Sequence, residues 1–463
     1  MKEALLFILL SSAFLWAGDL RIGCATVTIT PPVGTPMGSS YGTTVSTGVH
    51  DDLYAKALVL DLDGVKTAMV SCDLISIRRP IVSEARRLIE KATGLGGDQV
   101  ILSATHCHAG PQMSPVFLAL VPDAARRLAE QYVAGLPAKI AEAVRLAASH
   151  LTPARAWVHI GHEEHLTFNR RFLLKDGTVM MNPGRGNPNS VRPVGPIDPD
   201  VAVVYFDSPQ GKPLATFVNF ALHVAVAGGS LFSSDYPHVL ANTLASVKGP
   251  DMLTIFTNGM SGNINHVDVN DPVGLAGYPE VARIGTILAA DVLNAYRHLA
   301  PVTATRLQIR TQKVALPTQH FQPSEVEKAR QVVAGYGKKP GPAFLDVVHA
   351  WKVMDVAALD GRPLETEVQA ITLGDELAWV GMPGDAFTEL GLAIKTNSPF
   401  LHTVVSEQSG AGAISYVPNR KAFPEGAYEV ISARFAPGGA ELLVEQAVQM
   451  LVDLKQKLKS TIQ

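Results

Sequence analysis

Short runs of alternating or continuous apolar residues predict β-strands over much of the chain. The runs 54–62 and 66–73 flank Asp63 and Gly64, a dipeptide that is typical of a tight hairpin turn. The N-terminal part is therefore expected to begin with antiparallel strands. The other strands predicted in this way are 99–104, 201–207, 215–220, 253–257 and 305–314, and a second hairpin of 367–373 with 376–382.

Apolar positions that recur at spacings of three and four residues predict helices between these strands. The pattern covers 81–92 and 124–149, and Gly135 and Pro137 are expected to divide the second of these helices. Further helices are predicted at 279–299 and from 439 to about 459. Strands and helices alternate without a linker, an internal repeat or a low-complexity segment. We therefore predict an α/β fold in which mixed β-sheets are covered by helices, within one intertwined domain over 19–463.

The N-terminus has the pattern of a targeting segment. Lys2 precedes about a dozen apolar positions and a small residue, Ala17, which predicts a signal peptide over 1–18. A membrane anchor is the alternative, although the apolar run is short for a bilayer span. Either interpretation takes the rest of the chain out of the cytoplasm, so we expect a secreted or periplasmic protein.

Composition limits the classes of function. A chain of 463 residues that is 47% hydrophobic can bury a large core. The formal charge is only -3 and the charged residues alternate in sign, so no basic stripe is available for nucleic acid. With three cysteines, at least one thiol is unpaired, so disulfides are not the framework of the fold.

The segment SATHCHAGP contains the most suggestive chemistry. The predicted strand at 99–104 runs directly into His106 and His108 and is stopped by Gly110 and Pro111. On an extended backbone, His106 and His108 point to the same side. Two imidazoles that face one pocket can act as metal ligand, general base or oxyanion partner.

A second apolar strand delivers another histidine. His223 follows the apolar run in VNFALH and precedes a glycine pair and Asp235. Zinc sites take ligands from separate elements, so His223 is a candidate second donor, with a hydrogen-bonded core residue as the alternative. His238 is a weaker candidate and is expected at the surface or behind the ligands.

Three further segments carry polar candidates whose ordinary roles are structural. Asp385 follows a Pro-Gly turn where a helix is predicted to begin, and a helix cap is the alternative for it. Tyr416 and Tyr428 lie in a polar region, where packing or a single hydrogen bond is the usual role. Asn263 and His266 lie in a glycine-rich loop, either near the site or in a tight turn held by asparagine side chains.

Together these segments resemble the catalytic domain of the neutral, non-lysosomal ceramidases, which are zinc amidases that hydrolyse the N-acyl bond of ceramide. The resemblance spans nearly the whole chain, and it is specific because of the order and spacing of its motifs. It implies one ceramidase-like zinc hydrolase domain over 19–463. The motifs that carry it are GCATVTITPPVGTPMGSSYG, GVHDDLYAKALVL, ATHCHAGP, FNRRF, NFALHVAV, SSDYPH, NGMSGNINH, MPGD, SYVPN and AYE.

The resemblance also implies roles for individual residues. Zinc binding is implied for His106, His223, Asp385 and Tyr416. Transition-state stabilisation and substrate binding are implied for His108, Arg170 and Tyr428. Asp385 stands where the family has a glutamate, so either its loop moves inward or Glu389, one helical turn on, contributes instead. The family's additional C-terminal β-sandwich domain has no counterpart in this sequence, so its contribution to membrane docking is expected to be missing.

The implied mechanism is metal hydrolysis of ceramide or a related N-acyl lipid. Zinc polarises the carbonyl and lowers the pKa of its bound water toward about 7. Asp385 is expected to orient that water and take its proton, while His108 and Tyr428 donate hydrogen bonds to the oxyanion. The expected partners are a lipid-like substrate and, through it, a peripheral membrane contact.

Alternatives for the reaction, the metal and the class of protein stay open. A zinc-dependent esterase or a general N-acyl amidase could use the same site, because the metal acts on the carbonyl. The same ligand types would also accept manganese, iron or cobalt. A non-catalytic exported binding protein and a two-metal phosphoesterase built around His50, Asp51 and Asp52 are the less favoured classes.

Overall fold

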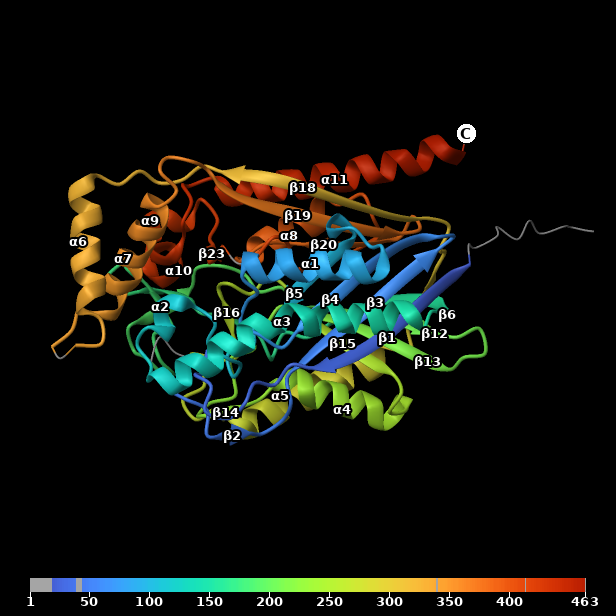
Figure 1. Cartoon of the computed structure of the whole chain (residues 1–463), viewed down its shortest axis with the longest axis horizontal. Helices are drawn as coiled ribbons and strands as arrows, with labels where there is room; N and C mark the ends of the chain where they lie inside the picture. Colours follow the sequence, from blue (N-terminus) through green and yellow to red (C-terminus); the bar gives the residue numbers. More distant parts are fainter. Residues whose placement is uncertain (1–18, 39–43, 339, 413, 463) are drawn as a thin grey trace, which may run out of the picture.

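The computed structural model describes residues 19–38, 44–338, 340–412 and 414–462, with side chains up to residue 457. The predicted signal peptide at 1–18 lies outside the described residues. The predicted fold class is confirmed, since mixed sheets are covered by helices (Figure 1). No helix in the described part of the chain has the length and apolar character needed to cross a bilayer.

The first sheet contains the N-terminal strands. Its members are β1 (Leu20–Thr28), β3 (Tyr54–Leu62), β4 (Val65–Cys72), β5 (Val100–Ala104) and β6 (Thr152–Pro153), in the order β5-β4-β3-β1-β6. The predicted hairpin of β3 and β4 is confirmed, and it turns at Asp63 and Gly64 with φ of 52° and 86°. Both residues need positive φ in this kind of turn, which explains why Asp-Gly occupies it. β5 joins the sheet parallel to β4.

A long helix covers this sheet. α3 (Asp123–Ser149) packs on β1 and β3 and beside α1 (Arg79–Thr93) (Figure 1). The prediction that Gly135 and Pro137 divide the helix is wrong, because α3 is continuous through both residues. A proline inside a helix costs about 3 kcal/mol. Burial of a large apolar side chain stabilises by about 1.5–3 kcal/mol, and α3 buries several of them, including Leu136, Ile140 and Val144, so their sum exceeds that cost.

The second sheet has the order β15-β13-β12-β7-β17. Its strands are β7 (Arg155–His162), β12 (Asp200–Asp207), β13 (Pro213–Phe220), β15 (Leu253–Asn258) and β17 (Ala300–Val302). β15 runs parallel to β13, whereas the other neighbours are antiparallel. The sheet is covered by α4 (Tyr236–Lys248) and by α5 (Tyr278–Ala295), which ends a few residues before the predicted boundary.

The third sheet has the order β18-β19-β20-β22. Its strands are β18 (Leu307–Leu316), β19 (Leu364–Leu373), β20 (Leu377–Gly381) and β22 (His402–Ser406). The predicted hairpin of β19 and β20 is confirmed, and β22 runs parallel to β20. α8 (Thr388–Asn397) packs on β22, and α11 (Gly439–Ile462) runs along β18 and β19.

The remaining elements are short or lie at one end of the molecule. α6 (Pro323–Gly335) and α7 (Phe344–Ala357) form a helical pair at one end of the molecule, where α7 contacts α10 (Ala427–Ser432) (Figure 1). The others are β2 (Gly48–Val49), β8 (Phe168–Asn169), β9 (Arg171–Leu174), β10 (Val179–Met181), β11 (Ser190–Pro193), β14 (Leu231–Phe232), β16 (Ile264–Asn265), β21 (Asp385–Ala386), β23 (Tyr416–Val417), α2 (Pro115–Leu118), α9 (Ala422–Glu425) and the 3-10 turn Gly97–Gln99.

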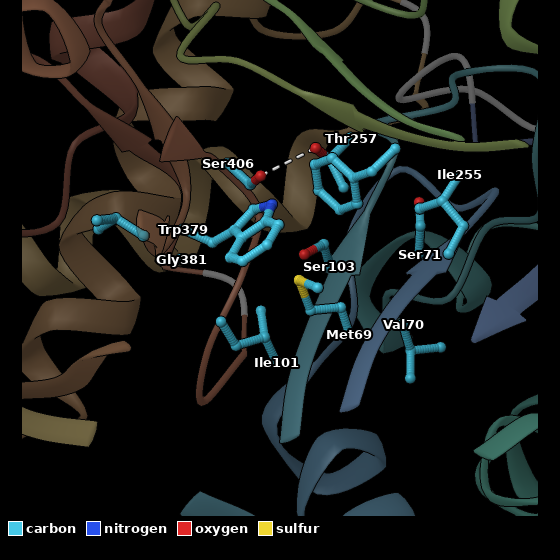
Figure 2. A pocket seen from close by; sticks show the side chains of 12 residues that line it. Met69, Val70, Ser71, Ile101, Ser103, Ile255, Thr257, Trp379, Gly381 and Ser406 are labelled. Carbon is cyan, nitrogen blue, oxygen red and sulfur yellow. Dashed lines mark hydrogen bonds between the residues drawn. The ribbon is translucent and has the colours of Figure 1, made fainter. Parts of the chain in front are cut away.

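All three sheets meet at a small internal cavity of about 10 Å³ (Figure 2). Side chains from each sheet line it, including Met69 on β4, Phe217 on β13 and Trp379 on β20. Ser406 and Thr257 join two of the sheets through a hydrogen bond of 2.9 Å between their hydroxyls. The three sheets therefore contact one another close to the ends of β5, β15 and β22.

The strands β5, β13, β15 and β22 belong to the parallel pairs of the three large sheets, β4–β5, β13–β15 and β20–β22. Loops that leave the carboxyl ends of parallel strands commonly form binding sites. Here the loops after β5, β13, β15 and β22 all contribute to one cluster of polar side chains.

Candidate metal centre

Three histidines converge at this edge. His106 Nε2 lies 3.1 Å from His108 Nε2 and 3.1 Å from His223 Nε2. Ligand nitrogens of the three residues all lie within 4.8 Å of one another. Tetrahedral zinc with Zn–N bonds of about 2.0–2.1 Å needs nitrogens about 3.3 Å apart. The group thus has the spacing of a metal site before any ion is placed in it.

Hydrogen bonds on the far side of the rings define which nitrogens face the centre. His106 Nδ1 lies 2.7 Å from the carbonyl oxygen of Ile75, and His223 Nδ1 lies 2.9 Å from that of Ser261. A carbonyl can only accept, so each Nδ1 carries the proton and each Nε2 presents a lone pair. Two lone pairs that face each other across 3.1 Å repel unless a cation lies between them.

An extended backbone was predicted at His106 and His108, but the backbone at His106 is not extended. His106 has a φ of 62°, in the left-handed region that non-glycine residues rarely adopt. His106 and His108 still converge, because the backbone N–H of His108 donates to the carbonyl of Val224 at 2.9 Å. This bond ties the loop after β5 to the residue that follows His223. Strained backbone of this kind clusters at functional sites.

Charge favours neutral imidazoles in the cluster. Burial lowers the pKa of His108 well below its ordinary value, and the charges of His106 and Arg170 lower it further. Burial and the same neighbours, Arg170 first, also lower the pKa of His223. Neutral imidazole is the form that binds a metal.

A buried arginine stands beside the histidines. Arg170 Nη1 lies 3.3 Å from His223 Nε2, and Arg170 Nη2 donates to the hydroxyl of Tyr416 at 3.0 Å. Glu429, which is fully buried, accepts from Arg170 Nε at 2.9 Å and from Arg171 Nη1 at 2.8 Å. Burial opposes the charge of Arg170, yet Tyr416 and Glu429 raise its pKa above the ordinary value. A fixed positive charge therefore faces the centre.

The two predicted tyrosines lie on the outer side of this arginine. The ring of Tyr416 lies beneath the Arg170 guanidinium at 5.4 Å and packs edge-on against Tyr428, with centroids 5.2 Å apart. Tyr428 in turn stacks on Phe344 of α7 at 6.0 Å, and Phe344 is 42% exposed. A row of aromatic rings therefore leads from the polar cluster to the surface.

Asp385 lies at the rim of the histidine cluster. It is not the cap of α8, because that helix begins at Thr388 and its N-cap is Phe387. Asp385 instead belongs to β21, which pairs with Tyr416 on β23. Its Oδ1 lies 3.3 Å from Nδ1 of His106 and accepts a hydrogen bond from Gln408. The structure thus brings Asp385 to the back of the first histidine ring.

A buried carboxylate that was not predicted from the sequence, Glu407, joins two of these loops. Glu407 accepts from the backbone N–H of Ser261 at 3.0 Å, from its hydroxyl at 2.7 Å and from the backbone N–H of Ala386 at 3.0 Å. Burial, and then the charge of Asp385, raises the pKa of Glu407 well above the ordinary value. The available signal was the polar run Glu407–Gln408 directly after the apolar residues of β22, the pattern that had singled out His106.

Loop candidates fall into two groups. Asn263 lies close to the site, since its carbonyl accepts from the backbone N–H of Arg170 at 2.8 Å and its amide donates to Glu389 at 2.8 Å. Glu389 thus contacts Asn263 rather than a histidine of the cluster. His266 is half-buried among charges that include Glu280, and His238 lies 3.6 Å from Asp51. Asp51 in turn accepts from two serines and is part of the polar packing around α4.

Comparisons with known proteins agree with the fold. No model of a known protein family matches the chain, and no curated protein sequence matches it. The solved structure of neutral ceramidase from Pseudomonas aeruginosa superposes with a TM-score of 0.71 at 18% identity, covering 95% of this chain and 75% of that chain. A ceramidase complexed with C2 gives 0.71 at 19% identity, covering 95% and 76%. The resemblance predicted from the motifs is thus confirmed at the level of architecture, and the chain has the neutral ceramidase fold.

Proposed function

We propose that this protein is a zinc-dependent hydrolase that cleaves the N-acyl amide bond of ceramide or a related N-acyl lipid. The observation that carries the proposal is the convergence of the three histidine Nε2 atoms beside the buried guanidinium of Arg170. The donor set fits zinc, because neutral imidazoles from separate loops are its usual ligands. Export of the protein by residues 1–18 stays a prediction.

A bound zinc ion would polarise the acyl carbonyl and lower the pKa of a bound water toward about 7. His106 and His223 would hold it, since their Nδ1 atoms donate to carbonyls and their Nε2 atoms are free to coordinate. Arg170 directs its guanidinium at the same place and is positioned to stabilise negative charge that develops on the substrate oxygen. Tyr428 remains the predicted neutral donor to that oxygen.

The lipid part of the substrate is supported by the aromatic row. Tyr416, Tyr428 and Phe344 extend from Arg170 to an exposed edge of α7, so an apolar chain can lie along them while the amide reaches the histidines. Leu345, next to Phe344, is 43% exposed and continues this apolar edge. The predicted peripheral membrane contact would involve this face.

The decisive experiment measures fatty acid released from a short-chain ceramide by mass spectrometry, with and without a zinc chelator. Release that is abolished by the chelator and restored by zinc is the expected result. His223→Ala should lose release, whereas His159→Ala, on β7 beside His298, should keep it. No release from zinc-loaded protein would reject ceramide, and matched ester and amide substrates would then test the esterase and general amidase alternatives. A purified protein that takes up no zinc would favour the binding-protein alternative.

A further inference from the structure

A surface pocket of about 470 Å³ lies outside the histidine cluster, between the three-stranded sheet β10-β9-β11 and α9. Its floor comes from the sheet, where Leu173 pairs with Val179 on one side and with Arg192 on the other. Residues that pair directly across strands share one face of a sheet, so these three side chains project into the same space. The opposite wall consists of Lys421, Pro424 and Glu425.

Two cations stand over this floor. Lys421 Nζ donates to the carbonyl of Val194, another residue of the wall, at 3.0 Å, so the ammonium is held at the pocket although much of its side chain reaches solvent. Arg192 Nη1 donates to the carbonyl of Pro193 at 3.1 Å, and Arg192 forms no ion pair with any described residue. An ammonium has three donors and a guanidinium has five, so both cations keep donors for a ligand.

The charge of the lining fits a monoanion. Beside Arg192 and Lys421, the lining contains one other ionisable side chain, Glu425, so two positive charges and one negative charge leave a formal charge of +1. Glu425 is also shared, because its Oε1 lies 3.9 Å from Lys421 and its Oε2 lies 3.2 Å from the buried Arg171. A carboxylate, with one charge and two acceptor oxygens, matches this balance better than a phosphate dianion.

Most of the remaining lining is apolar, with hydrocarbon from Leu173, Val179, Val194 and Pro424. Pockets for small organic ligands commonly have volumes of about 300–1,000 Å³, apolar walls and a few convergent polar groups. We propose that this pocket binds a carboxylate that carries an alkyl chain. The carboxylate would lie between Arg192 and Lys421, and the chain would lie over the apolar floor.

Such a ligand belongs to the class of acid that hydrolysis of an N-acyl amide releases, since a free carboxyl group is ionised near pH 7. Only this identification rests on the proposed function. Arg171, which shares Glu425 with the pocket, also pairs with Glu429, the partner of Arg170 beside the histidines. A line of alternating charges thus leads from the pocket toward the metal centre. Among the described residues that line the pocket, none is Arg170 or a histidine of the cluster, so an acid bound here leaves the metal centre free.

Isothermal titration calorimetry of the full chain with octanoate tests the proposal. Octanoate should bind more tightly than hexanoate, by about 4-fold for each additional methylene that is buried. Lys421→Gln and Arg192→Gln should each weaken octanoate binding by at least about 10-fold, because each removes a charge-assisted hydrogen bond. Glutamine at position 421 can still donate to the carbonyl of Val194, so the wall of the pocket is kept.

Lys212→Gln is the matched control, because it removes an exposed lysine that also has a carboxylate partner, Asp251 at 3.3 Å, outside the pocket. It should leave octanoate binding unchanged, and so should His223→Ala, which alters the metal centre. The comparison of Lys421→Gln with Lys212→Gln, two surface substitutions, decides the matter even where His223→Ala does not fold.

An unaltered protein that does not bind octanoate would overturn the proposal. Binding that is lost in His223→Ala and kept in Lys421→Gln would do the same, since the carboxylate would then bind at the histidines. Equal affinity for acetate or inorganic phosphate would reveal a site for any small anion, and equal affinity for octanol a purely apolar one, and either result contradicts the proposal. Binding needs no turnover, so an inactive protein whose octanoate site depends on Lys421 would reject the proposed hydrolysis and leave the pocket standing.

Discussion

Removal of the Glu429 carboxylate tests whether Glu429 neutralises Arg170 and Arg171 beside the metal centre. Glu429 is fully buried and joins two buried guanidiniums, those of Arg170 and Arg171. In Glu429→Ala both lose an ionic partner without access to solvent. Breaking a buried pair by removing one member costs about 3–5 kcal/mol. Arg171 keeps Glu425 at 3.2 Å, so the lower half of that range is expected.

This loss is large enough to measure as a shift in melting temperature. The unfolding entropy of globular proteins is about 2.1 cal/mol/K per residue, which gives about 1.0 kcal/mol/K for a chain of 463 residues. Glu429→Ala should therefore lower Tm by about 3–4 °C in differential scanning calorimetry. The released Arg170 side chain should also reduce turnover of any substrate that the unaltered protein cleaves.

Glu84→Ala provides the matched control. Glu84 pairs with Arg87 at 2.6 Å in a fully exposed arrangement on α1, and exposed pairs of this type contribute little. Its Tm should change by less than about 1 °C. If Glu429→Ala changes Tm as little as Glu84→Ala does, the view that Glu429 neutralises the arginine pair is refuted.

Three other predictions address backbone fit, pH and metal. Gly262→Ala should lower the free energy of unfolding by about 1–3 kcal/mol, because its Cβ would overlap the carbonyl of Asp385. Gly135→Ala, which has open space around it in α3, should raise that free energy by about 0.5–1 kcal/mol. Equal changes for the two variants in denaturant unfolding would contradict the close approach of Gly262 to Asp385. Burial and Glu163 raise the pKa of Asp291 from 3.8 to about 6, so the folded state holds a proton in that window and loses stability as pH rises through it. In urea unfolding, Asp291→Asn should thus have the same free energy of unfolding as the unaltered protein below about pH 4. Above about pH 6 its free energy of unfolding should be higher by about 1 kcal/mol, a value that is reduced because Asp291 is partly exposed. A difference that does not change with pH would exclude the raised pKa. Zinc at 100 times its dissociation constant should stabilise the folded protein by about 2.7 kcal/mol and raise its Tm by about 3 °C. If zinc does not raise the Tm of the unaltered protein, zinc does not bind its folded state.

Much of the fold could be predicted because its signals are local. The hairpin at Asp63–Gly64 and the strands that end near His106 and His223 are written in runs of fewer than ten residues. Pro137 shows the limit of such reasoning. Proline usually ends a helix, so the sequence around Pro137 predicts a break there. Contacts of α3 with β1 and β3, which cannot be read from neighbouring residues, keep the helix continuous.

The candidate site could be predicted in part for the same reason. Histidines at strand ends are visible along the chain, but their partners are distant. Glu429 is more than 250 residues from the arginines that it pairs with, and Glu407 is 146 residues from Ser261. A buried glutamate in sequence looks like any surface glutamate until the tertiary structure places a cation or a loop against it.

At the metal centre, main-chain atoms are among the partners of the histidines. The shortest contacts to the Nδ1 atoms of His106 and His223 come from the carbonyls of Ile75 and Ser261, which belong to the main chain and would be present with any side chain at those positions. A motif search therefore finds nothing at either residue. The sequence must instead encode the loop conformations, and at Ser261 it does so through Glu407, whose carboxylate fixes both the backbone N–H and the hydroxyl of that residue. It follows that substitution of Glu407 should disturb His223 more than Ser261→Ala, which keeps the carbonyl contact of 2.9 Å and removes only the longer hydroxyl contact of 3.3 Å.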